Sequence, residues 1–277
     1  NLWRKNMPEL PEVETIRRDL ERLIVGRKVL GIETNSPKQV QPSLEVIKKA
    51  IVGATIKKVQ RRAKVLQLFF SNGAIIIVHL KLTGRLLVRN KSDRPDDWQH
   101  ITVSLDGGKE LRFADARKFG WFRLLKNEKE LQEILKEFGP EPFDDLNLVL
   151  FKKILSTNRQ PIKLVLMDQQ KIAGVGNIYA NEALFLAGID PRRPANKINS
   201  TEAKKLYKSL EKVLKLGIQY RGASDQYYLD AHGQKGAYQE HFLVYGRQGQ
   251  KCPNCSGLVK RITVGGRGTF YCPACQK

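Results

Sequence analysis

The sequence contains no long apolar run, no internal repeat and no low-complexity tract. Wholly apolar stretches such as "AIIIV" at residues 74–78 are far too short to span a bilayer. The first six residues, "NLWRKN", carry charges but lack the apolar segment of a secretory signal. We therefore expect no membrane-spanning segment and no repeat architecture.

Acidic residues are also scarce, because 28 Asp and Glu stand against 49 Lys and Arg, which gives a formal net charge of +21. Such an excess attracts polyanions, and neutralisation of phosphates by Lys and Arg is the main sequence-independent term in nucleic-acid affinity. The basic residues are spread along the chain instead of gathering beside one amphipathic helix, which favours nucleic acid over a membrane surface. A length of 277 residues suggests two domains.

Only four cysteines occur, and all lie in the last 26 residues. They form two C-x2-C pairs separated by sixteen residues: Cys252, Cys255, Cys272 and Cys275. This spacing falls within the four-cysteine zinc pattern. Two disulfides are the alternative, which the lack of a secretory signal disfavours. Because four thiolates leave no open coordination position, the predicted Zn²⁺ is structural and not catalytic.

The stretch "MPELPEVETIRRDL" is acidic within a basic chain. Pro11, Glu12 and Glu14 fit the first turn of a helix, where proline and carboxylates are favoured. Apolar residues at helical spacing continue this helix: Val13, Ile16, Leu20 and Leu23. The helix leaves Pro8 and Glu9, which precede it, unexplained.

Beyond this helix the sequence pattern is first strand-like and then helical. Gly26 supplies a stop, and residues 28–125 hold short strand-like runs joined by the turn sequences "SNG", "LTG" and "DGG". This pattern predicts a β-sandwich or barrel. From residue 126 the period becomes 3.6, and "GPEP" at residues 139–142 marks a predicted linker. An α-rich second domain then leads into the cysteine segment, which we expect to form a small ribbon.

Three motifs admit both a structural and a functional interpretation. In "AGVGNIYANEALF", Asn177 belongs either to a phosphate site at a helix start or to a tight turn in which it is the N-cap. In "FADARKFGWF", Arg117 and Phe119 are either a solvated cation beside a core aromatic or part of a loop that enters a nucleic-acid stack. In "GGRGTFYCPAC", Arg267 stands at a turn suited to phosphate contact, although the glycines can also serve the hairpin alone.

Alternating cations in "QRRAK" lie within a predicted strand. One face of an exposed strand is commonly charged. From this pattern alone, we interpret Arg61, Arg62 and Lys64 as solvated.

In their order along the chain, the motifs resemble those of one family. They are "PELPEVE", "RRAK", "HLKLTG", "DARKFG", "GVGNIYANEALF", "VYGRQG" and "GRGTFYCPACQK". Over residues 7–277 the chain is similar to bacterial formamidopyrimidine-DNA glycosylase. The resemblance implies an α+β fold with an N-terminal β-sandwich flanked by helices, a helical helix-two-turn-helix domain and a C-terminal zinc ribbon. The expected division is a 1–6 extension outside the active enzyme, a catalytic domain over 7–138, a DNA-binding domain over 139–245 and a zinc finger over 246–277.

The same resemblance implies a catalytic set of Pro8, Glu9, Lys64 and Arg267. After removal of the preceding methionine, Pro8 would be the nucleophile, since an N-terminal proline is a secondary amine that can attack C1′ and form an iminium ion. Glu9 would serve the sugar oxygen and the proton transfers. Lys64 would lie near the phosphate of the damaged nucleotide, and Arg267 resembles the zinc-finger arginine that grips the backbone.

The resemblance also implies a set of DNA-binding residues: Leu82, Trp98, Arg117, Phe119, Arg159, Asn177 and Arg267. Arg117 and Phe119 resemble the residues that fill the gap left by a flipped base, with Arg117 facing the orphaned cytosine. Leu82 stands where many members have an intercalating methionine, and Trp98 where a DNA-contacting histidine is expected. Asn177 resembles the phosphate-binding residue of the helix-two-turn-helix.

The implied function is base-excision repair: removal of oxidised purines, chiefly 8-oxoguanine and formamidopyrimidines, from double-stranded DNA, then β/δ elimination at the abasic site. Residues 221–238 would cover the everted base. We expect one structural Zn²⁺, a monomer, and a bacterial cytoplasmic location with nucleoid association through DNA. An endonuclease VIII-type enzyme for oxidised pyrimidines is an alternative, disfavoured by "PELPEVE" in place of a "PEGPE" start. A non-catalytic lesion binder is a second alternative, which requires that Pro8 is never exposed.

Residues 1–6 bear on the proposed nucleophile. The nitrogen of an internal proline is an amide without a basic lone pair, so Pro8 cannot form an iminium ion while residues 1–6 remain attached. We therefore expect these residues to be upstream sequence or an expression remnant, and the active form to begin at Pro8.

Overall fold

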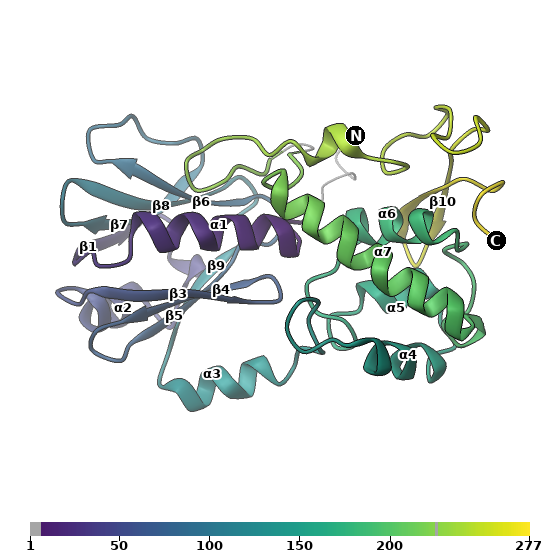
Figure 1. Cartoon of the computed structure of the whole chain (residues 1–277). Helices are drawn as coiled ribbons and strands as arrows, with labels where there is room; N and C mark the ends of the chain where they lie inside the picture. The colour runs from purple at the N-terminus through teal and green to yellow at the C-terminus, as the bar shows by residue number, and fades with distance from the viewer. Residues whose placement is uncertain (1–6, 225–226) are drawn as a thin grey trace. The chain divides into compact units, whose positions relative to one another are not determined.

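The computed structural model describes residues 7–224 and 227–277 (Figure 1). The expected extension at residues 1–6 lies outside the described residues. The chain divides into two compact units. They are the described residues up to Lys136 with those of Tyr220–Ala237, and Glu137–Gln219 with Tyr238–Lys277.

The first unit is built on two β-sheets, which form the expected β-sandwich. The four-stranded sheet has the order β1-β7-β8-β6, from Val29–Thr34, Gln99–Leu105, Lys109–Asp115 and Gly84–Asn90. The five-stranded sheet has the order β2-β9-β5-β4-β3, from Val40–Gln41, Trp121–Leu125, Ile75–His79, Val65–Phe70 and Ile56–Arg62. Neighbouring strands are antiparallel except for the β2–β9 pair. The flanking helices are α1 (Leu10–Leu23), α2 (Leu44–Ile51) and α3 (Glu128–Leu135).

One hydrophobic cluster joins both sheets to α1. Val13, Ile16 and Leu20 on one face of α1 are fully buried, and the helix contacts β3 and β4 of one sheet and β6 of the other. Phe113 of β8 and Phe122 of β9 meet edge to face with ring centroids 5.4 Å apart. The core therefore fixes α1 alongside both sheets, as Figure 1 shows.

Helix α2 corrects the expectation that residues 28–125 form strands only. Ser43 caps the helix by accepting a hydrogen bond from the Val46 backbone at 3.4 Å. Ile47 and Ile51, four residues apart, are fully buried on the inner face. A serine cap and a single apolar repeat are enough for this two-turn helix once the sheet offers a surface to cover.

An ion pair ties α1 to the β3–β4 hairpin. Arg61 Nε donates to Glu14 Oε2 at 3.1 Å, and the Arg61 side chain is only 10% exposed. Burial alone would raise the pKa of Glu14, but hydrogen bonds from Arg17 and Arg18 and the charge of Arg61 lower it to about 2. The interpretation of Arg61 as solvated is therefore wrong, because its partner is a carboxylate 47 positions away in the sequence.

The segment Tyr220–Ala237 packs with the first unit, although we expected it within the domain at 139–245. Arg221 donates hydrogen bonds to Asp19 on α1 and to Asp230, each at 2.6 Å. Both carboxylates are almost fully buried. The pair with Asp19, 202 positions away in the sequence, explains why composition along the chain did not reveal the attachment, and the functional boundaries stay a prediction.

The second unit is mostly helical. Its α-helices are α4 (Leu148–Ser156), α5 (Ile162–Met167), α6 (Asn177–Ala187) and α7 (Ser200–Gln219). Helix α6 is apolar on nearly every side and lies buried against α7, as a central helix should. Tyr179 of α6 lies so close to Gly217 of α7 that an added Cβ would come within 2.5 Å of the ring. In the described part of the chain, no helix is long and apolar enough to cross a membrane.

Two turns join α5 to α6 and complete the helix-two-turn-helix. Gln169 organises them, because its Nε2 donates to the carbonyls of Met167 and Val175, each at 2.8 Å. Helix α6 begins at Asn177, and Gly176 is its N-cap. The alternative in which Asn177 is the N-cap is therefore wrong, because the preceding glycine already adopts the extended cap conformation.

The cysteine segment forms the expected ribbon, with strands β10 (Lys260–Val264) and β11 (Arg267–Tyr271). Gly265 and Gly266 turn the hairpin with φ of 55° and 73°. Lys163 of α5 is fully buried and donates to Thr269 Oγ1 at 2.6 Å. Asn181 Oδ1 of α6 accepts from the Phe270 backbone at 2.8 Å. The ribbon is thus fastened to the helices of its own unit.

Candidate catalytic residues and zinc centre

Pro8 and Glu9 lie at the start of α1, and both are buried. Glu9 is the N-cap, and it forms a capping box with Glu12. Glu12, which is 2% exposed, accepts from the Glu9 backbone through Oε2 and from the Ala223 backbone through Oε1, each at 2.8 Å. One buried carboxylate therefore fixes the backbone of a predicted catalytic residue and of the Tyr220–Ala237 segment.

Lys64 occupies the two-residue turn between β3 and β4. The other turn residue, Ala63, has φ of 52°, and its carbonyl accepts from Arg61 Nη1 at 2.9 Å. Lys64 is only 6% exposed, so its interpretation as solvated is wrong. It lies near enough to His79 for its charge to act on that imidazole.

Leu82 is half-buried in the turn between β5 and β6, here called the Leu82 turn (residues 80–83). Lys81 adopts φ of 54°, and its backbone N–H donates to Nδ1 of His79 at 3.0 Å. That bond requires a ring without a proton on Nδ1. Burial, together with the charges of Lys81 and Lys64, lowers the pKa of His79 to about 3. The turn therefore rests on a histidine that stays neutral at physiological pH.

Arg117 and Phe119 occupy the loop between β8 and β9, here called the Phe119 loop (residues 116–120). Both are exposed, and the Arg117 guanidinium lies 4.5 Å from the centroid of the Phe119 ring. The alternative of a core aromatic is wrong, because Phe119 is 49% exposed. A hydrogen bond from Thr83 to the buried carboxylate of Asp115 ties this loop to the Leu82 turn. Three predicted DNA-binding residues thus lie on adjoining loops.

Trp98 precedes β7 and is 49% exposed. Its ring meets Tyr227 with centroids 6.4 Å apart, and the Arg85 guanidinium lies 5.7 Å from its centroid. Arg85 Nε also donates to the Tyr227 carbonyl at 2.7 Å. Trp98 therefore contacts the Tyr220–Ala237 segment while half of its surface stays open.

The second unit carries the remaining candidates. Asn177 is half-buried at the first turn of α6, and Asn181 Nδ2 donates to its side-chain oxygen at 3.3 Å. Arg159 is exposed between α4 and α5. Arg267 is exposed at the first position of β11. Arg159 and Arg267 thus present exposed cations to solvent, as phosphate contacts require.

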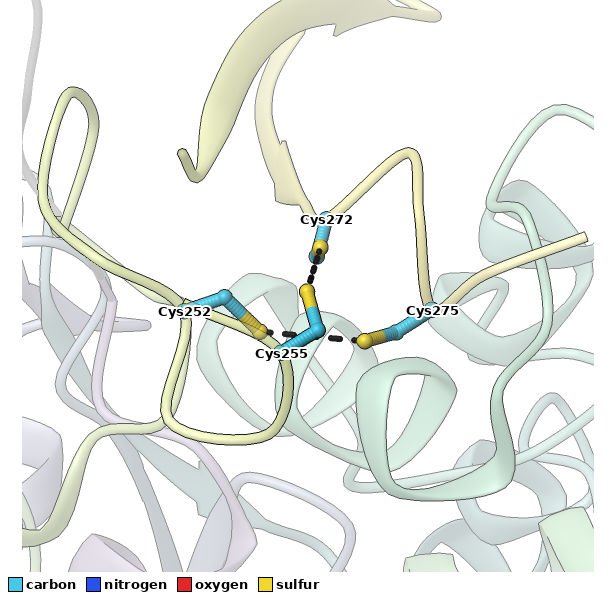
Figure 2. A group of neighbouring side chains, drawn as sticks. All are labelled: Cys252, Cys255, Cys272 and Cys275. Atoms are coloured by element: carbon cyan, nitrogen blue, oxygen red, sulfur yellow. Dashed lines mark hydrogen bonds between the residues drawn. The ribbon is translucent and has the colours of Figure 1, made fainter. Parts of the chain in front are cut away.

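The four cysteines gather at one end of the ribbon (Figure 2). All four sulfurs lie within 4.8 Å of one another, with Cys252 and Cys275 Sγ atoms 3.8 Å apart and those of Cys255 and Cys272 3.5 Å apart. A tetrahedron with Zn–S bonds of about 2.3 Å has S···S edges of about 3.8 Å. The donor set therefore fits one Zn²⁺, and the disulfide alternative is wrong, because these separations far exceed an S–S bond.

Sequence reasoning missed three residues that shape these sites. Asp115 and His79 lie within "DARKFG" and "HLKLTG", but neither motif indicates their roles, and the helix macrodipole alone accounts for Glu12 in the sequence. Each acts by accepting a hydrogen bond from backbone in another loop or helix turn. His79 and Asp115 are each a polar residue at the end of an apolar strand, and this is the sequence signal that could have revealed them.

Three known domain families match the chain in order. The N-terminal domain of formamidopyrimidine-DNA glycosylase matches residues 7–122, and its H2TH domain matches residues 138–228. The zinc finger found in FPG and IleRS matches residues 249–277. Together these regions define a β-sandwich protein with a helix-two-turn-helix and a zinc finger.

Relatives cover 97–98% of the chain. Formamidopyrimidine-DNA glycosylases of Herpetosiphon aurantiacus and Streptococcus mutans are 44% and 40% identical to the chain, each over 98% of this chain and 100% of the relative. The Fpg of Lactococcus lactis in complex with abasic-site DNA is 36% identical, with a TM-score of 0.91 over 97% of this chain and 99% of that one. The chain therefore belongs to the formamidopyrimidine-DNA glycosylase family.

Zinc removal is predicted to abolish DNA binding while leaving the first unit folded. Metal binding and local folding are coupled in four-cysteine modules, and the ribbon carries Arg267. Elemental analysis should give one zinc per chain, and chelation should eliminate binding of duplex DNA, with recovery when zinc is restored. Fluorescence of Trp98 and Trp121, both in the first unit, should hardly change. Active protein without metal would contradict the assignment.

Acid should destabilise the first unit through His79. Its pKa is about 3 in the folded state and near 6.5 when unfolded, so the unfolded chain takes up a proton first and stability is lost as the pH falls below 6.5. Between pH 6.5 and 5.5 the free energy of unfolding should fall by about 1 kcal/mol more in the wild type than in His79→Gln. Urea unfolding followed by tryptophan fluorescence measures this difference.

His241→Gln is the matched control for that measurement. His241 lies in the second unit, whereas Trp98 and Trp121 report on the first, so its replacement should leave the measured pH dependence unchanged. If the free energy of unfolding of His79→Gln fell with pH as steeply as that of the wild type, His79 would not be held neutral in the folded protein.

Proposed function

We propose that this protein is a bifunctional DNA glycosylase and abasic-site lyase that removes oxidised purines, chiefly 8-oxoguanine and formamidopyrimidines, from double-stranded DNA. The observation that carries the proposal is the ordered match to three domains of one glycosylase family. Solved relatives from Lactococcus lactis hold DNA with an abasic site or with Fapy-dG. A net charge of +21 suits the same partner.

We assign the nucleophile to Pro8, acting as a free N-terminal amine. Its nitrogen attacks C1′ while the bond from C1′ to the damaged base breaks, and the departing base takes a proton. The bond from C1′ to O4′ then breaks, O4′ is protonated, and the nitrogen lone pair forms the iminium bond to C1′. The amine proton is released in this step.

Elimination follows from the charge on the iminium ion. The cation acidifies C2′, so that loss of a C2′ proton expels the 3′ phosphate, and a second elimination expels the 5′ phosphate. Water finally hydrolyses the iminium ion and regenerates Pro8. We assign to Glu9 the proton transfers at O4′ and C2′. The fixed backbone of Glu9, hydrogen-bonded to Glu12, supports that role.

The other catalytic and DNA-binding roles follow the same family pattern. We assign Lys64 to the phosphate of the damaged nucleotide, and Arg267 to backbone contact and to the catalytic set. Leu82, Arg117 and Phe119 fill the gap left by the everted base. Further DNA contacts are assigned to Trp98, Arg159 and Asn177. The adjoining positions of the Leu82 turn and the Phe119 loop, and the exposure of both cations at Arg159 and Arg267, support these assignments.

Structural zinc holds the ribbon and takes no part in the bond chemistry, because Cys252, Cys255, Cys272 and Cys275 supply all four coordination positions.

We also propose functional domains over residues 7–138, 139–245 and 246–277. A cytoplasmic location, with association to the nucleoid through DNA, fits the basic charge and the family.

Substrate choice separates this proposal from an endonuclease VIII-type activity. The single-turnover rate of excision of 8-oxoguanine opposite cytosine should exceed that of thymine glycol by about tenfold or more. A pocket that fits one lesion and rejects the other discriminates by at least that factor. Duplexes of identical sequence that differ only in the lesion provide the matched comparison. Faster excision of thymine glycol would favour the pyrimidine-directed alternative, and binding without excision of either lesion would favour a non-catalytic binder.

Blocking the nitrogen of Pro8 should abolish excision. We compare protein that begins at Pro8 with protein that retains residues 1–7, both verified by intact mass. The extended form should bind duplex DNA but leave 8-oxoguanine in place, because an amide nitrogen cannot attack C1′. Equal rates for the two homogeneous forms would rule out Pro8 and make Lys64 the next candidate.

Phe119→Ala should impair the excision of paired lesions more than the cleavage of a preformed abasic site. Unstacking costs a few kcal/mol per base step, so loss of the wedge should slow excision by about tenfold to a hundredfold. Phe143→Ala is the control, since Phe143 is 42% exposed and also lies beside a cation, Lys215, with the ammonium 5.6 Å from its ring centroid. Equal losses on both substrates would contradict a wedge role.

A further inference from the structure

A single carboxylate holds the base of the Phe119 loop. Asp115 is the last residue of β8 and is fully buried. Its Oδ1 accepts from the Arg117 backbone at 3.2 Å, and its Oδ2 accepts from the Gly120 backbone at 2.7 Å. The carboxylate therefore spans the loop from its second residue to its last, and fixes the chain on both sides of Phe119.

The same carboxylate reaches the Leu82 turn. Thr83, which is 3% exposed, donates its hydroxyl proton to Asp115 Oδ1 and accepts from the Arg117 backbone at 3.1 Å. The Thr83 hydroxyl thus bridges the end of one loop and the start of the other. Residues 34 positions apart in the sequence are joined through one side-chain oxygen.

Close packing closes the remaining gap between the two loops. A Cβ added to Gly120 would lie 2.8 Å from the His79 carbonyl and 3.1 Å from the Leu80 carbonyl, so only glycine permits this approach. Gln39 Nε2 donates to the Gly120 carbonyl at 2.9 Å and to Asp115 Oδ2 at 3.3 Å. Both loops therefore share one buried, hydrogen-bonded frame.

Hydrogen-bond donors from three parts of the chain satisfy the carboxylate at the centre of this frame. A buried carboxylate is costly unless its oxygens are hydrogen-bonded, and the four donors to Asp115 are a hydroxyl, an amide side chain and two backbone N–H groups. All four of these donors are uncharged groups. The frame is buried while Arg117 and Phe119 beyond it are exposed.

We infer that Asp115 and Thr83 are positioning residues that join the Leu82 turn and the Phe119 loop into one rigid wedge, which controls base extrusion and not the bond chemistry. The inference rests on the proposed function. A wedge inserts against the resistance of base stacking, so its two loops must not yield independently. The hydroxyl of Thr83 is the point at which they are coupled.

Thr83→Val tests the inference, since valine keeps the shape of threonine and removes the hydroxyl. Thr83→Ser keeps the hydroxyl and provides the rescue. Thr102→Val is the control, because Thr102 is also buried in the four-stranded sheet and accepts a hydrogen bond, from Gln99 Nε2 at 2.7 Å. For each protein we measure single-turnover excision of 8-oxoguanine in duplex DNA, cleavage of a preformed abasic site, urea stability, and fluorescence of 2-aminopurine placed beside an uncleavable abasic-site analogue.

Thr83→Val should slow excision by about tenfold or more while cleavage of the preformed abasic site changes by less than about threefold. The rise in 2-aminopurine fluorescence on binding should be reduced. Thr83→Ser should restore both the excision rate and the fluorescence rise. Thr102→Val should match the wild type in both measurements, even if its free energy of unfolding falls as far as that of Thr83→Val. Equal losses on both substrates, failure of serine to rescue, or an equal defect in Thr102→Val would overturn the inference.

The fluorescence measurement separates this inference from the proposed function, because it needs no bond cleavage. If the wild type excises nothing, the proposed function fails. A fluorescence response that is then identical in the wild type and Thr83→Val would overturn the inference as well, whereas a response reduced only in Thr83→Val would retain the wedge in a DNA-distorting protein.

Discussion

Burial of a carboxylate requires hydrogen-bond donors, and this requirement organises the segments on which the proposed function depends. Glu12 receives backbone N–H groups from the start of α1 and from Ala223. Asp115 receives them from both sides of the Phe119 loop. Glu182 on α6 receives three, from the consecutive residues 243–245 that lead into the ribbon. In each case one acidic side chain holds loop backbone that has no regular secondary structure of its own.

This use of carboxylates also accounts for the charge of the surface. The chain has few acidic residues, and Glu9, Glu12, Asp19, Asp115, Glu182 and Asp230 are all almost fully buried. Carboxylates that accept backbone N–H groups in the interior, such as those of Glu12, Asp115 and Glu182, add little negative charge to the surface, whereas Asp19 and Asp230 pair with Arg221. The excess of Lys and Arg is therefore available to a polyanion, and the same inward carboxylates fix the loops that would meet it.

Much of the architecture could be predicted from the sequence, because it depends on local patterns. The apolar spacing of Val13, Ile16 and Leu20 specified α1, and the cysteine spacing specified the zinc ribbon. Long-range partners could not be predicted in this way. The burial of Lys64, the pairing of Arg61 with Glu14, and the attachment of Tyr220–Ala237 to the first unit all depend on residues distant in the sequence.

The candidate site also contains residues that the sequence predicted and residues that it did not. Motif order predicts the roles of Pro8 and Glu9, since family motifs keep chemical groups at fixed places, and cysteine spacing predicted the zinc ligands. The groups that hold the Leu82 turn and the Phe119 loop, such as His79 and Asp115, act through hydrogen bonds from backbone N–H groups of those loops, which form only in the folded chain. Their motifs placed them beside the functional residues but did not reveal which loop they would hold.

We propose that Pro8 forms a covalent bond with C1′ of the damaged nucleotide, and one experiment tests this directly. Borohydride reduces an iminium ion to a stable amine, so trapping on an 8-oxoguanine duplex followed by proteolysis and mass mapping identifies the residue that carries the sugar. We expect a single adduct on the nitrogen of Pro8, in protein that begins at that residue. An adduct mapped to Lys64 or another lysine, or excision with no trappable adduct, would contradict it.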